Sequence, residues 1–126
     1  MKRDFDSYWY TDIRPIDTIK ELLWGSAELY SDNPAFWVKR EKEASYEAIN
    51  YRLLKKDVEA LGTRMIDMGL RGAKIAVMGQ GCYEWIVTYL AVINGVGIVV
   101  PIDRDLSSDV CLADHLAHDL GQRIIA

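Results

Sequence analysis

Apolar residues recur at spacings of three and four along two stretches in the first half of the chain, a spacing typical of amphipathic helices. Thr18 and Glu21 stand before the first stretch with the spacing of a capping box, and Asp32-Asn33-Pro34 follows it. We therefore expect a helix that begins at Thr18 and packs one side against a core. Its apolar stripe is Ile19, Leu22, Leu23, Ala27 and Tyr30.

The second stretch runs from 47 to 68 and predicts the longest helix of the chain. Gly69 follows it, at the place where a left-handed residue commonly ends a helix. Its two methionines suit gap-filling in a core better than binding a soft metal, since no other soft ligand lies near them in the sequence. The expected core stripe is Ile49, Leu53 or Leu54, Val58, Leu61, Met65 and Met68.

Between these helices, two short runs with strand character, 35–39 and 44–46, flank the charged residues 40–43. A charged tetrad between two such runs is typical of a solvated turn in a small β-hairpin.

After Gly72 the pattern changes to short apolar runs separated by helical segments, the signature of βαβ units. The fold class is therefore α/β: an amino-terminal arm, a helix, a small hairpin, a long helix, and then βαβαβ, part of a parallel sheet with helices on its faces. The chain ends inside an apolar run. Because parallel strands are usually buried on both faces, we expect truncation at Ala126. The expected elements are strands at 74–78, 97–102 and 123–126 and helices at 83–94 and 108–120.

Residues 1–16 form the predicted arm, and 17–126 the first part of a larger domain. The arm holds Phe5, Tyr8, Trp9 and Tyr10 without a helical or strand period. Packing against the body of the domain is the favoured interpretation of these rings, and a ligand cage is the alternative.

Composition narrows the function classes. The 126 residues include 50% hydrophobic and 27% charged residues, values typical of a globular domain, and no apolar run is long enough to cross a bilayer. Net charge is -4 with the signs interspersed, which argues against nucleic acid as a partner. The start lacks the apolar stretch of a secretion signal, and Cys82 and Cys111 lack metal or redox spacing. Both features favour a cytoplasmic setting.

Two turns could hold chemistry. Gly79-Gln80-Gly81 lies between a predicted strand and a helix, where a dinucleotide loop would lie, but Glu84 replaces the third glycine and the bulky Trp85 follows. A tight strand-to-helix turn is therefore expected. Asp103-Arg104-Asp105 follows a predicted central strand, at the edge where α/β proteins bind ligands. Satisfying free backbone groups is the commoner role of an aspartate at such a turn.

One predicted helix carries five metal-ligating side chains, some of which share a face at a spacing of four. No second ligand group appears elsewhere, so a solvated outer face is favoured over a metal site. No nucleophile with an adjacent base and no lysine-ended glycine loop is found. We therefore assign no catalytic, cofactor-binding or metal-binding residue. The five side chains are Cys111, Asp114, His115, His118 and Asp119.

Four segments resemble the start of the adenylate-forming (AMP-binding) superfamily, particularly its long-chain fatty acyl-CoA ligases. The third segment has a Gly-Gln-Gly-Cys turn where the family usually has a Gly-Glu-Asn-like sequence, and the fourth matches a specific core motif that ends in Pro-Ile-Asp. The segments are Thr18 to Leu23 with Asn33 to Phe36, Ala44 to Tyr46 with the helix reaching Gly62, Lys74 to Ala91, and Ile93 to Asp103.

The resemblance implies an enzyme that joins a carboxylate to AMP, with ATP, Mg and CoA as cofactors, and then forms a thioester. The family's reactive motifs would lie beyond Ala126, so the fragment alone is predicted inactive, with the remainder of the parent enzyme as its partner. Gly95, Gly97, Pro101 and Asp103 are expected to be architectural.

Two other functions stay open: a self-contained nucleotide-binding domain using Gly79 to Gly81, and an interaction module built on the aromatic arm. An unfinished sheet edge also favours a homo-oligomer.

Overall fold

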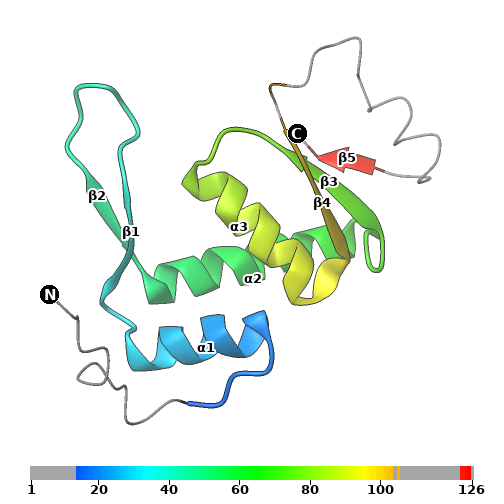
Figure 1. Ribbon diagram of the computed structural model, residues 1–126, viewed down its shortest axis with the longest axis horizontal. Coiled ribbons are helices and arrows are strands. Elements are labelled where there is room, and N and C mark those ends of the chain that lie inside the picture. The colour runs from blue at the N-terminus through cyan, green and yellow to red at the C-terminus, as the bar shows by residue number, and fades with distance from the viewer. Residues whose placement is uncertain (1–13, 104, 106–122, 126) are drawn as a thin grey trace, which may run out of the picture.

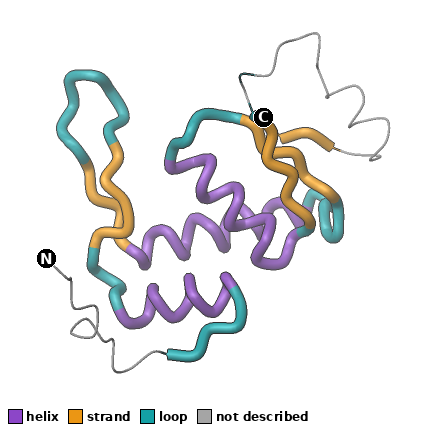
Figure 2. The backbone as a smooth tube through the Cα atoms, viewed as in Figure 1, coloured by secondary structure: helices purple, strands orange, loops and turns teal. Residues whose placement is uncertain are grey.

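The computed structural model describes residues 14–103, 105 and 123–125, and it has the predicted α/β architecture (Figure 1). Over these residues a helix, a hairpin and a second helix come first, and a parallel sheet with a crossover helix between β3 and β4 follows (Figure 2). The elements are α1 (Ile19–Leu29), β1 (Pro34–Val38), β2 (Glu47–Asn50), α2 (Tyr51–Asp67), β3 (Lys74–Met78), α3 (Tyr83–Ala91), η2 (Val92–Val96, a π-helical turn), β4 (Ile98–Ile102) and β5 (Arg123–Ile125).

The described strands form two separate sheets. Strands β1 and β2 pair antiparallel, with Val38 opposite Glu47. The larger sheet has the order β4-β3-β5 with all pairs parallel, and Ile75 pairs with Val99 on one side and Arg123 on the other. The predicted strands at 74–78, 97–102 and 123–126 are thus confirmed to within one residue at their ends. The helix expected at 108–120 lies outside the described residues.

Capping side chains fix where both long helices begin. Thr18 Oγ1 accepts the Glu21 N–H at 3.1 Å, while Glu21 Oε2 accepts the Thr18 N–H at 3.2 Å, which completes the predicted capping box. Asn50 caps helix α2, and its Oδ1 accepts the Leu53 N–H at 2.9 Å. At its other end Gly69 has φ 79°, the left-handed conformation expected there.

The structure corrects the boundary between the hairpin and the long helix. The second strand is Glu47–Asn50 and not 44–46, and the helix begins at Tyr51 and not at 47. Ile49 is 5% exposed and pairs with Phe36 in the hairpin. It fits the helical spacing and the strand equally well, and the Asn50 cap decides between them because the carboxamide ends the extended backbone.

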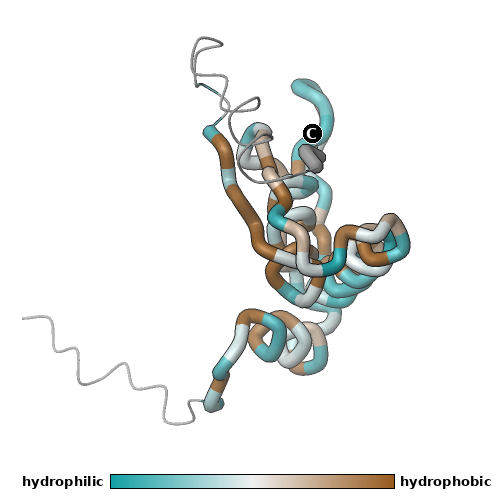
Figure 3. The backbone as a smooth tube through the Cα atoms, turned by 90° about the vertical axis from the view of Figure 1, so that its right-hand side faces the viewer, coloured by the Kyte–Doolittle hydropathy of each residue, from teal (hydrophilic) through white to brown (hydrophobic). Residues whose placement is uncertain are grey.

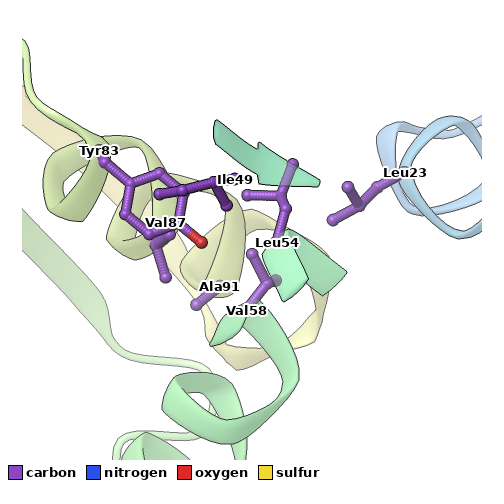
Figure 4. Close-up of a cluster of buried hydrophobic side chains, with 7 residues drawn as sticks. All are labelled: Leu23, Ile49, Leu54, Val58, Tyr83, Val87 and Ala91. Atoms are coloured by element: carbon purple, nitrogen blue, oxygen red, sulfur yellow. The ribbon is translucent and has the colours of Figure 1, made fainter. Parts of the chain in front are cut away.

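Two clusters of buried side chains form the core, and α2 contributes to both. The first joins α1, the hairpin, α2 and α3, and Figure 4 shows Tyr83, Val87, Ile49 and Leu54 converging in it. The second joins the end of α2 to the sheet through Met65, Leu70, Ile75, Val77, Val92 and Val96.

The predicted stripe of α1 is only partly buried. Leu23 and Ala27 face the core, whereas Ile19, Leu22 and Tyr30 are 48%, 44% and 51% exposed. At the other end of α2, Met68 is 47% exposed. In Figure 3, α1 at the bottom carries hydrophobic and hydrophilic residues in alternation, while long hydrophobic runs follow the sheet. Helix α1 packs mainly on α2, so one narrow contact is enough to place it.

Two glycines shape the junction between α3 and β4. Gly95 has φ 134°, so the backbone leaves the helical conformation within the π-helical turn Val92–Val96. Gly97 N–H donates to the Val92 carbonyl at 3.0 Å, and the next residue, Ile98, donates to the Ala73 carbonyl at 2.9 Å. A Cβ at Gly97 would overlap the Ala73 carbonyl oxygen. The expected architectural role of this glycine pair agrees with these contacts.

We expect Gly97→Ala to lower the free energy of unfolding by about 1–3 kcal/mol, because the methyl group must push β4 away from Ala73. Gly81→Ala is the matched control, since a Cβ there meets nothing within 4 Å. Its effect should stay within about 0.5 kcal/mol. Urea unfolding of the purified chain measures both, and equal effects would contradict the steric argument.

Candidate functional site

The structure brings the two candidate turns to one edge of the parallel sheet. Met78 pairs with Ile102, so Gly79 and Asp103 are the next residues along neighbouring strands. In α/β proteins ligands bind at this carboxyl edge. The sequence-based placement of both turns at a ligand-binding edge is therefore geometrically sound.

The Gly79–Gly81 turn is shaped by packing and not by left-handed glycine backbone. Neither Gly79 nor Gly81 has a positive φ. A Cβ at Gly79 would contact Trp85 Cδ1 at 3.4 Å, and the Trp85 ring stacks on Tyr89 with 5.3 Å between ring centroids. Trp85 thus fills the space beside the turn, as its bulk predicted. A small, mainly apolar pocket of about 220 Å³ remains beside Met78 and Thr88.

The amino terminus of α3 already carries a carboxylate. Glu84 lies in the first turn of the helix, and the hydrogen bond from its own backbone N–H is the main cause that lowers its pKa. Arg40 Nη1 from the hairpin also donates to Glu84 Oε1 at 3.2 Å. Since Glu84 supplies negative charge where a phosphate would lie, this turn does not favour a nucleotide.

Asp103 satisfies the backbone of its own turn. Its Oδ1 accepts the Asp105 N–H at 2.9 Å. This geometry agrees with the expectation that Asp103 satisfies free backbone groups in the turn. Asp103 Oδ1 thus accepts a hydrogen bond from the backbone of its own turn.

Sequence reasoning missed a wider cleft between the hairpin and α3, with a volume of about 470 Å³. Trp37, which is 63% exposed, Arg40, Cys82 and Glu84 help to line it. Arg40 closes one side by pairing with Glu84 and with Glu47. Arg40 and Glu84 are 44 residues apart, so no local spacing signals their contact.

At the floor of this region a buried tyrosine binds a carboxylate. Tyr83 is 9% exposed, its hydroxyl donates to Asp57 Oδ2 at 2.7 Å, and its ring meets Phe36 edge-on. Burial first, and then the Asp57 hydrogen bond and charge, raise the pKa of Tyr83 far above its usual 10.0. Tyr83 therefore stays protonated and links α3 to α2.

The remaining candidates fall largely outside the described residues. These include the possible metal ligands Cys111, Asp114, His115, His118 and Asp119, as well as the aromatic residues of the arm. Within 14–103, 105 and 123–125, no three His, Cys, Asp or Glu side chains gather as metal ligands do. No helix in that same part of the chain has the length and apolarity needed to cross a membrane.

Fold and site together define an α/β scaffold whose parallel sheet carries the Gly79–Gly81 turn and Asp103 at its carboxyl edge. A family model described as "AMP-binding enzyme" matches residues 23–118. This match spans most of the chain, which therefore belongs to the AMP-binding enzyme family.

Solved structures share the fold at low identity. The structure of IdnL1 matches with a TM-score of 0.71 and 20% identity over 86% of this chain and 22% of that one. The NpsA N-terminal subdomain of Klebsiella oxytoca matches with a TM-score of 0.68 and 16% identity over 88% of this chain and 28% of that one. The fatty acid AMP ligase of Legionella pneumophila matches with a TM-score of 0.69 and 15% identity over 85% of this chain and 19% of that one. The chain spans less than a third of each. No curated protein matches it.

We expect Tyr83→Phe to lower the free energy of unfolding by about 1–3 kcal/mol at neutral pH, since Asp57 loses a hydrogen bond to a charged acceptor. A raised folded pKa means that the stabilisation is complete below the unfolded pKa of 10.0 and declines as pH rises above it. The wild-type advantage over the variant should therefore shrink above pH 10.0. Urea unfolding over a pH series measures this, and a constant difference would refute it.

Proposed function

We propose that this chain is the opening portion of an adenylate-forming acid–thiol ligase and serves as its scaffold. Residues 17–126 would be the first part of the large domain, and 1–16 an arm. Membership of the AMP-binding enzyme family is the observation that carries the proposal. The carboxyl edge of the sheet supports it, since the described groups there hold the backbone or each other.

The proposed reaction overcomes the poor leaving group of a carboxylate. The carboxylate oxygen attacks the α-phosphate of ATP, the bond to pyrophosphate breaks, and an acyl-adenylate forms. The CoA thiol then attacks the acyl carbon, loses its proton, and releases AMP. Mg and cationic side chains would offset the charge that develops on the phosphates. We assign these roles to the remainder of the parent enzyme, which is the proposed partner of this chain.

A long-chain fatty acid is the proposed substrate. The resemblance of four segments to long-chain fatty acyl-CoA ligases motivates it, and one structural match carries the name fatty acid AMP ligase. A second candidate is an aromatic acid, because a matching NpsA structure holds 3-hydroxyanthranilyl-AMSN. Cytoplasmic location and self-association through a sheet edge stay predictions.

The test uses the complete enzyme encoded by the source gene. We expect pyrophosphate exchange into ATP that depends on a long-chain fatty acid, and a thioester once CoA is added. This chain alone should support neither reaction. Exchange with aromatic acids only would favour the second candidate, while exchange by the isolated chain would overturn the scaffold proposal. Tight nucleotide binding by the isolated chain would instead favour a self-contained nucleotide domain.

We expect Asp103→Ala in the complete enzyme to reduce stability more than the affinity for ATP, because the Asp105 N–H loses its acceptor. A loss of about 1 kcal/mol is expected, seen as a lower melting temperature. The dissociation constant for ATP should change less than about twofold, which corresponds to about 0.4 kcal/mol of binding free energy. Normal stability with strongly weakened ATP binding would show that Asp103 belongs to the ligand site.

A further inference from the structure

Helix α1 carries apolar side chains on a side that the described core does not cover. Leu23 and Ala27 are buried, whereas Ile19, Leu22 and Leu29 are 48%, 44% and 63% exposed. Because a helix has about 3.6 residues per turn, Leu22 and Leu29 lie two turns apart on one face, and Ile19 adjoins them one turn earlier. We call these three residues the outer stripe. Apolar side chains scattered singly need no explanation, but a stripe of them favours an interaction surface.

The chain approaches α1 along this same side. It turns at the Thr18 capping box, and Figures 1 and 3 place the segment 14–18 below α1, while α2 lies above the helix. Arg14 shows how closely the segment approaches, since a Cβ at Gly25 would overlap its guanidinium group. The segment therefore doubles back over the helix that it precedes.

The contact at Gly25 lies within the outer stripe. Gly25 comes three residues after Leu22 and four residues before Leu29, which places it between them on the helix surface. Because Gly25 has no side chain, the Arg14 guanidinium can lie directly on the helix there. The apolar stem of an arginine also covers hydrophobic surface while its charge stays in water. The chain that continues upstream of Arg14 therefore starts from the middle of the stripe.

The upstream chain has the length and the chemistry to cover the stripe. An extended chain advances about 3.3 Å per residue, so the step from Arg14 to Tyr10 spans about 13 Å. The helix rises about 1.5 Å per residue, so Leu29 lies only about 6 Å beyond Gly25 along the axis. Residues 1–13 lie outside the described residues, and their aromatic members are Phe5, Tyr8, Trp9 and Tyr10.

Tethering favours this segment over a separate molecule as the occupant. A tether of a few residues gives an effective concentration of about millimolar, so a few side-chain contacts are enough to hold the segment in place. A stable interface between two proteins buries about 1,200 Å² or more, which three side chains on one helix do not supply. The outer stripe is therefore better matched to the arm than to a second copy of the chain.

We propose that the amino-terminal arm docks on the outer stripe of α1. The rings of residues 8–10 pack against Leu22 and Leu29, and Arg14 fixes the arm at Gly25. Docked in this way, the rings are not available for a ligand cage or for a separate partner. The docking does not depend on the ligase activity proposed above.

NMR of the full chain, ¹³C-labelled at the leucine methyl groups, tests the contact. We expect nuclear Overhauser effects between the ring protons of residues 8–10 and the methyl groups of Leu22 or Leu29. Chymotrypsin, which cleaves after aromatic residues, tests the same docking. Leu22→Gln with Leu29→Gln should speed cleavage within residues 8–10 about tenfold, because cleavage follows the population of the undocked arm.

Tyr46→Gln is the matched control, since Tyr46 is 64% exposed in the distant hairpin and its loss should leave this cleavage unchanged. Should the double variant fail to fold, as judged by its amide spectrum, Leu29→Gln alone replaces it and should speed cleavage about threefold. Absence of the methyl contacts, unchanged cleavage in the glutamine variants, or equal acceleration by Tyr46→Gln would each overturn the proposal. Contacts that disappear on dilution would overturn it too, and would assign the stripe to a second copy.

Discussion

The approach of β4 to β3 is the contact on which the rest of the described structure depends. The Ile98 N–H reaches the Ala73 carbonyl at 2.9 Å only because Gly97 has no side chain in between. Nearby, the Gly72 N–H donates to the Val96 carbonyl at 2.7 Å. These bonds fix the parallel register from Lys74 opposite Ile98 onward, and with it the positions of Gly79 and Asp103 at the far edge.

Helix α2 extends this constraint to the amino-terminal half. Leu54 and Val58 belong to the first core cluster, Met65 belongs to the second, and Leu61 packs against both. Because the two clusters share one helix, the hairpin and the sheet cannot shift independently. The Tyr83 hydroxyl on Asp57 adds a directional link between α3 and α2, which apolar packing alone would not provide.

The sequence predicts those parts of the fold that local patterns control. The Thr18 capping box, the left-handed Gly69 and the three strands of the parallel sheet follow from spacing and turn residues. The boundary between β2 and α2 at Ile49 does not follow from spacing, because a residue buried in a strand can also match a helical stripe. The exposure of Ile19 and Leu22 depends on how much of α1 meets α2, which no local pattern records.

The candidate sites divide in the same way. Residues that follow two parallel strands, such as Gly79 and Asp103, could be placed at one edge from topology alone. The Arg40–Glu84 pair joins segments that are 44 residues apart in the sequence, so only the packed structure brings them together. Such a contact leaves no local motif in the sequence.

The two ends of α3 have opposite electrostatic needs, and the chain meets them differently. At the amino end, where helix N–H groups attract negative charge, the chain supplies its own anion in Glu84. At the other end Lys20 of α1 and Arg71, which precedes β3, line a pocket beside the helix terminus and suit its negative charge. Charge at the first end is balanced from within. At the second end the cations come from segments far from α3 in the sequence, so only the packed fold places them there.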